Sequence, residues 1–88
     1  MKIFKYKLEI TDHQTIEMPT NSAILTVQMQ NGSPHLWAIV DETSTSWQKY
    51  YFRTYGTGHD LDDDYETQDY IGTYQVQGLV FHVFKENL

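Results

Sequence analysis

The chain has 88 residues, a net charge of −6 and no cysteine. This length suits one domain, residues 1–88, and the lack of cysteine excludes a disulfide framework and thiolate chemistry. The excess of acids disfavours direct binding to nucleic acid or to an anionic membrane, and no apolar run approaches the roughly 18 residues that span a bilayer.

The first half of the chain alternates apolar and polar residues with the period of two that is typical of β-strands. This pattern predicts strands over Lys2–Ile10, Gln14–Met18 and Ala23–Gln30. Asn31-Gly32 is a strong hairpin signal, because both residues tolerate a positive φ angle. The returning strand, His35–Asp41, is apolar almost throughout, which indicates burial on both faces or at an interface.

The second half continues the same pattern. Trp47–Tyr55 predicts an aromatic-rich strand, and Tyr70–Gln77 and Leu79–Phe84 predict two more that meet at a tight turn. Between them, the segment 60–69 holds six acids and no base, which is typical of a solvated loop. No segment carries a sustained helical stripe. We therefore predict an all-β domain of six to seven short strands, either an antiparallel sandwich or a partly open barrel.

The inward positions of these strands predict one packed core. Eight side chains are selected by their period-two placement: Leu25, Val27, Trp37, Ile39, Phe52, Ile71, Phe81 and Val83. Aromatic residues lie on both faces of Trp47–Tyr55, and His35–Val40 is apolar on both sides, which is more than one thin layer can bury. We therefore expect a homodimer formed through a strand edge or an aromatic face.

One segment combines a cation with a glycine-rich turn at the end of a strand. It contains the candidate binding residues Arg53, Tyr55, Gly56, Thr57, Gly58 and His59. Backbone N–H groups in such a turn can hold an anion, and an arginine adds a bidentate contact to phosphate or carboxylate. The competing interpretation is a plain strand-terminal turn in which Arg53 pairs with a surface acid.

The candidate binding surface continues into the acids Asp60, Asp62, Asp63 and Asp64. A calcium loop of the EF-hand type needs glycine at its sixth position and glutamate at its twelfth, and the chain has Tyr65 and Ile71 there. We therefore predict no metal site. Two interpretations stay open: a plain solvated loop, or a recognition surface that docks on a basic patch of a partner.

No arrangement of residues points to catalysis. The four histidines are dispersed without the H-E-x-x-H or H-x-H spacing of metal enzymes, and the serines lie in polar turns without a G-x-S-x-G elbow. His82 lies in an apolar strand, which favours a hydrogen-bonded core or interface histidine over a metal ligand. We therefore predict a non-enzymatic protein with no cofactor.

Several motifs follow one another along most of the chain. They are K-Y-K-L-E-I-T-D-H-Q-T-I-E-M-P from Lys5, V-Q-M-Q-N-G-S-P from Val27, L-W-A-I-V-D from Leu36, R-T-Y-G-T-G-H from Arg53, Y-I-G-T from Tyr70 and L-V-F-H-V-F from Leu79. In this order they resemble a family of short, uncharacterised proteins from tailed bacteriophages and prophages. The chain departs from that family at His35, where relatives often have cysteine, and Glu42–Tyr51 and Asp60–Asp69 look particular to this member.

The resemblance implies a phage accessory protein that acts in the cytoplasm of a bacterial host. Such proteins frequently act by binding, so we expect an inhibitor of a host protein of antiviral defence. The alternative is an oligomeric protein that sequesters a small nucleotide-like or other anionic signal near Arg53–His59. The expected partners are thus a host protein or a small anion, and neither nucleic acid nor a membrane.

Overall fold

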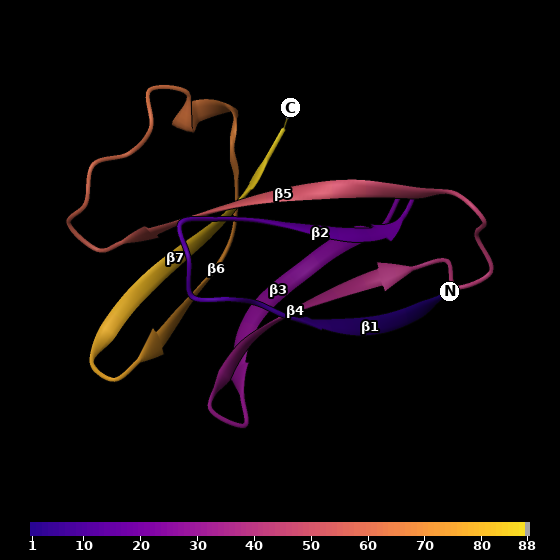
Figure 1. Cartoon of the computed structure of the whole chain (residues 1–88), viewed down its shortest axis with the longest axis horizontal. Coiled ribbons are helices and arrows are strands. Elements are labelled where there is room, and N and C mark those ends of the chain that lie inside the picture. Colours follow the sequence, from indigo (N-terminus) through magenta and orange to yellow (C-terminus); the bar gives the residue numbers. More distant parts are fainter. Residues whose placement is uncertain (88) are drawn as a thin grey trace.

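A computed structural model describes residues 1–87, and within them it shows seven strands and one 3-10 helix (Figure 1). The elements in chain order are β1 Lys2–Lys7, β2 His13–Pro19, β3 Ala23–Gln30, β4 Ser33–Val40, β5 Trp47–Gly56, η1 Tyr65–Thr67, β6 Asp69–Val76 and β7 Leu79–Glu86. The helical structure in this range is neither long nor apolar enough to cross a membrane.

The strands form two antiparallel sheets. The first has the strand order β1-β4-β3 and the second the order β2-β5-β7-β6. In Figure 1, β2 and β5 run side by side above β1 and β4. The predicted all-β fold of six to seven strands is confirmed, and the two sheets stay separate rather than closing into a barrel.

The first strand is shorter than the sequence predicted. It ends at Lys7 rather than at Ile10, and the N–H of Leu8 donates to the carbonyl of Pro34 over 3.0 Å. Beyond this bond the chain leaves the first sheet and crosses to the second, where β2 begins at His13. Ile10 lies on this crossing and is 54% exposed, although its spacing matches the apolar face of the strand.

The hydrophobic core lies between the two sheets. Its buried members are Leu8, Met18, Val27, Leu36, Ala38, Val40, Tyr50, Phe52, Tyr74 and Val83. Of the predicted core residues, Val27, Phe52 and Val83 are confirmed as buried, and Ile71 and Phe81 pack against the cluster while partly exposed. Both sheets contribute to the cluster, so the described chain has one shared core.

The core prediction was wrong for Leu25, Trp37 and Ile39. Two neighbours of Leu25 in β3 pair with consecutive residues of β4, so Leu25 is the extra residue of a β-bulge and is 45% exposed. Trp37 and Ile39 alternate with the buried residues of β4, which places them on the outer face of the three-stranded sheet. A strand that is apolar on both sides carries no pattern that fixes which face is buried.

Both tight turns predicted from the sequence are present. Asn31 and Gly32 have φ angles of 51° and 80°, and Gln77 and Gly78 have φ angles of 50° and 80°. Two consecutive residues with positive φ are characteristic of a type I′ turn, whose twist suits antiparallel strands. These turns join β3 to β4 and β6 to β7.

The edge strands β3 and β6 of the two sheets come into close contact. A Cβ atom at Gly72 in β6 would lie 3.1 Å from the backbone nitrogen of Val27 in β3. Gly72 directly follows a second β-bulge, at Ile71. Glycine at this position therefore allows the backbones of the two sheets to approach each other.

Candidate functional site

The connection between β5 and β6, residues 57–68, is the wide loop at the upper left of Figure 1. Tyr55 lies beneath it and is only 3% exposed. The Tyr55 hydroxyl donates to Oε1 of Gln68 over 2.8 Å, and the backbone N–H of Asp62 donates to the same hydroxyl oxygen over 3.4 Å. One buried tyrosine thus holds the middle and the end of the loop.

A salt bridge between Arg53 and Asp62, which we call the clasp, fastens the same loop. Alternation along β5 places Arg53 and Tyr55 on one face, and the Arg53 guanidinium carbon lies 4.2 Å from the centre of the Tyr55 ring. Nε of Arg53 donates to Oδ2 of Asp62 over 2.9 Å, and Nη2 donates to Oδ1 over 3.2 Å. Arg53 also donates to the Thr54 carbonyl over 2.6 Å, and its side chain is 13% exposed.

The clasp changes the titration of both of its members. The side-chain hydrogen bonds between them hold the pKa of the Asp62 carboxyl below its ordinary value and raise the pKa of the Arg53 guanidinium. The only arginine of the chain is therefore already paired. The interpretation in which Arg53 pairs with a surface acid matches this geometry.

Two backbone N–H groups of the glycine-rich turn after β5 already donate hydrogen bonds within the protein. The N–H of Thr57 donates to the carbonyl of Val80, and the N–H of His59 donates to the carbonyl of Gly56, each over 3.1 Å. The imidazole of His59 lies against Gly56, where an added Cβ would come within 2.9 Å of the ring. The N–H groups of Thr57 and His59 are therefore not free to hold an anion.

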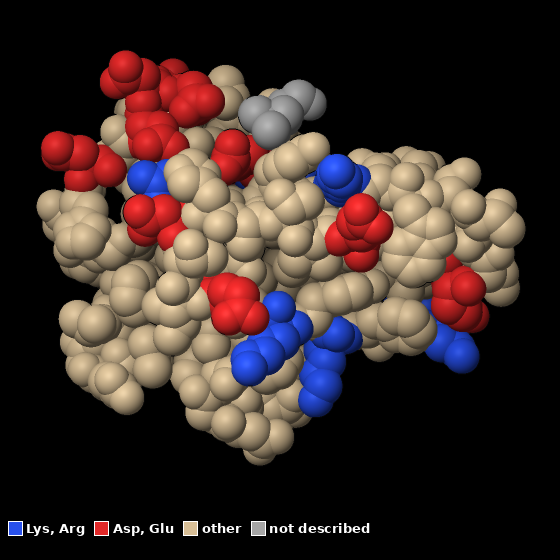
Figure 2. Space-filling view, viewed as in Figure 1, with Lys and Arg blue, Asp and Glu red and all other residues tan. Residues whose placement is uncertain are grey.

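Most acids of the loop point outward. Asp60, Asp63, Asp64 and Glu66 are exposed, and we call these four residues the acidic surface. Figure 2 shows acidic side chains gathered over the loop at the upper left, with most lysines at a distance from them. The clasp neutralises Asp62 alone, so the acidic surface keeps its net negative charge.

A hydrogen-bonded histidine lies beside this loop, and its network was not predicted from the sequence. Nε2 of His82 lies 2.7 Å from Oγ1 of Thr57, and Nδ1 lies 2.9 Å from Oγ1 of Thr73. The Thr73 hydroxyl in turn bonds the hydroxyl of Tyr70. The pairing of β6 with β7 places Thr73 opposite His82. If the register of these strands had been known, the contact between Thr73 and His82 could have been predicted.

An aromatic hollow of about 340 Å³ opens between the start of the loop and the strands β6 and β7. It is lined by residues 55–59, Leu61, Tyr70, His82 and Phe84. The ring of Phe84 meets both Tyr55 and Tyr70 edge-on, with centroids 5.5 Å apart in each pair. All predicted site residues therefore belong to one region, which consists of the clasp, the turn, the hollow and the acidic surface.

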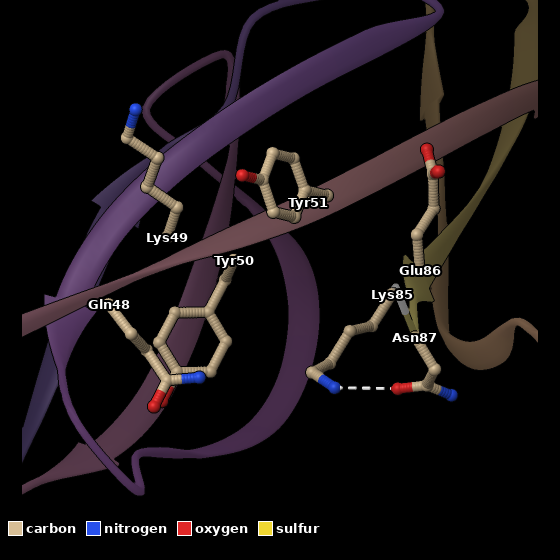
Figure 3. Close-up of a pocket in the computed structure, with 7 residues that line it drawn as sticks. All are labelled: Gln48, Lys49, Tyr50, Tyr51, Lys85, Glu86 and Asn87. Atoms are coloured by element: carbon tan, nitrogen blue, oxygen red, sulfur yellow. Dashed lines mark hydrogen bonds between the residues drawn. The ribbon is translucent and has the colours of Figure 1, made fainter.

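A second hollow, of about 260 Å³, lies at the other end of β5 and contains none of the predicted site residues. In Figure 3, Lys49 and Tyr51 project to one side of the strand while Gln48 and Tyr50 project to the other. Lys85 is turned to Asn87, whose Oδ1 accepts its hydrogen bond over 2.8 Å. These side chains do not converge on a common point, and the geometry gives no binding site there.

Across residues 1–87, no three His, Asp or Glu side chains are grouped so that they could hold a metal ion. The fold and the site together define a small two-sheet β-protein that carries an acidic loop fastened over one sheet. The chain belongs to the family described as a domain of unknown function (DUF7352), whose model matches residues 1–88. Neither curated proteins nor solved structures give a match.

Proposed function

We propose that this protein is a phage accessory protein that acts by binding, without catalysis, in the cytoplasm of a bacterial host. Its target is a host protein of antiviral defence, and its contact is the acidic surface of Asp60, Asp63, Asp64 and Glu66. The sequence resemblance supports the biological setting. The fastening of the loop supports the binding role, and it is the observation on which the proposal rests.

A fastened loop is a better binding surface than a mobile one. The clasp and the bond from Tyr55 to Gln68 order the loop before any partner arrives, so less conformational entropy is lost on association. Its free carboxylates complement a basic patch, which accelerates association and selects against acidic partners. The favoured target is therefore a protein with a basic surface.

The alternative function, sequestration of a small nucleotide-like or other anionic signal, has less support. Such an anion would compete with Asp62 for Arg53, and it would approach past the acidic surface. The turn offers neither the N–H of Thr57 nor that of His59. We therefore expect nucleotides to leave the melting temperature unchanged, whereas a true ligand at a hundredfold excess over its Kd would stabilise the fold by about 2.7 kcal/mol.

The direct test is capture of a target from bacterial host lysate by wild-type protein and by two charge variants. Asp63→Asn with Asp64→Asn removes two charges from the acidic surface, and Glu9→Gln with Glu17→Gln removes two exposed charges elsewhere. We expect the loop variant to associate roughly 3- to 10-fold more slowly with the captured protein and with a weaker salt dependence, while the control matches wild type. Equal association rates of the two variants with the captured protein, or no specific capture by wild type, would contradict the proposal.

A further inference from the structure

The aromatic hollow beside the acidic surface has walls suited to a cation. Tyr70 forms one wall and is 58% exposed, and its ring is braced by Phe84 and by the hydroxyl of Thr73. Aromatic faces attract cations because the ring quadrupole places negative charge above the ring plane. An open, fixed tyrosine ring is therefore available to a bound group.

Several polar groups of the hollow are already paired. Both ring nitrogens of His82 lie within hydrogen-bond distance of threonine hydroxyls, those of Thr57 and Thr73. The N–H groups of Thr57 and His59 donate to carbonyls. These groups are therefore not available to an anion, and the aromatic faces are the main feature of the hollow.

The surrounding charge has the matching sign. Asp60 follows directly after the lining residue His59, and Asp63 and Asp64 lie further along the same exposed loop. The protein itself contains one example of an arginine held by an aromatic ring and a carboxylate. Arg53 stacks on Tyr55, which lines the hollow, and pairs with Asp62. A planar guanidinium uses both kinds of contact at once, since it stacks on rings and pairs bidentately with carboxylates.

We propose that the aromatic hollow is an anchor site for one arginine side chain, supplied by the protein partner. The guanidinium lies against the ring of Tyr70, and its N–H groups face the carboxylates of the loop. This inference rests on the proposed function only for the source of the arginine. The site itself is a property of the hollow and can be examined without the partner.

The test is an NMR titration of the ¹⁵N-labelled protein with N-acetyl-arginine amide, in which the guanidinium is the only charged group. We expect saturable shifts at the amides of Gly58, Leu61, Tyr70 and Phe84, with a millimolar Kd. The citrulline analogue, which is neutral but nearly the same shape, is expected to bind at least fivefold more weakly. Equal binding of the two compounds would overturn the proposal, and stronger binding of N-acetyl-lysine amide would overturn the choice of arginine.

Matched variants locate the binding. Tyr70→Leu removes the ring from an exposed position and is expected to weaken arginine binding at least fivefold, whereas Tyr70→Phe keeps the ring and should retain it. Trp47→Leu removes an aromatic side chain of similar exposure at the far end of β5 and should change nothing. Unchanged binding in Tyr70→Leu would contradict the site.

The two proposals fail in different ways. Arginine bound in the hollow by a protein that captures no host target would leave the anchor site standing and remove the proposed function. If a captured target depends on Asp63 and Asp64 but not on Tyr70, the proposed function stands and the hollow is not the anchor site.

Discussion

At the scale of single residues, Arg53 decides how the candidate site is organised. The sequence predicted that Arg53 and the acids after it belong to one functional region, since they lie at a strand end and in the loop beyond it. It did not predict that Arg53 binds Asp62, because the two are separated by a loop whose path no local pattern specifies. The contact of Tyr55 with Gln68 was missed for the same reason.

The clasp gives the loop a dependence on pH. Because its partner lowers the pKa of Asp62 in the folded protein, the contribution of the clasp is fully present above the unfolded value of about 3.9 and is lost as the pH falls through the lower folded value. We expect the amides of Leu61 and Gln68 to show a step in their NMR shifts below about pH 4. In Asp62→Asn this acid-dependent step should disappear. An acid-dependent step that persists unchanged in Asp62→Asn would show that another group fastens the loop.

At the scale of elements, the strands and their positions along the chain were predictable, the order of strands within the two sheets was not predicted, and the buried faces were predicted only in part. Turn signals and alternation defined all seven strands, and the type I′ turns at Gly32 and Gly78 formed as expected. The bulge at Leu25 shifted the alternation of β3 by one residue, which no composition signal reveals. In β4 both faces are apolar, so the period of two did not show which set is buried, and Trp37 was assigned to the core although its neighbours Leu36 and Ala38 are the buried ones.

The burial seen in the structure predicts which large side chain contributes most to the stability of the fold. Phe52 is completely buried, so Phe52→Ala should lower the free energy of unfolding by about 3–5 kcal/mol, close to the whole stability of a small domain. Trp37 is half-buried on an outer face, so Trp37→Ala should cost about 1–2 kcal/mol. Urea unfolding of both variants measures the difference. If Trp37→Ala lowered the free energy of unfolding more than Phe52→Ala, Trp37 would be a core residue after all.

At the scale of the whole molecule, no element within residues 1–87 covers the outer face of the three-stranded sheet. Register places Ile3 beside Ile39 on this face, with Trp37 next to Ile39 along β4 and Lys5 and Lys7 toward one end. Asp41 follows the opposite end of β4. A two-fold axis running across the strands would bring the lysines of one copy toward Asp41 of the other, so a second copy of the chain fits this face better than an uncharged partner.

We therefore propose a homodimer through this face. Light scattering at micromolar concentration should report twice the 10.4 kDa mass of one chain. Ile3→Glu introduces a charge at a 60% exposed site on the face and should give a monomer, whereas Leu79→Glu, at a 59% exposed site elsewhere, should leave the mass unchanged. A wild-type particle of about 10 kDa would contradict the dimer.

The central claim is that residues 57–68 form a fixed binding surface and not a solvated, mobile loop. The most direct measurement is the ¹⁵N relaxation order parameter of each backbone amide in this segment, compared with those of β5 and β7. Because the clasp and Tyr55 hold the loop at Asp62 and Gln68, we predict values near 0.85, as in the strands. Values below about 0.6 across residues 57–68 would contradict the claim.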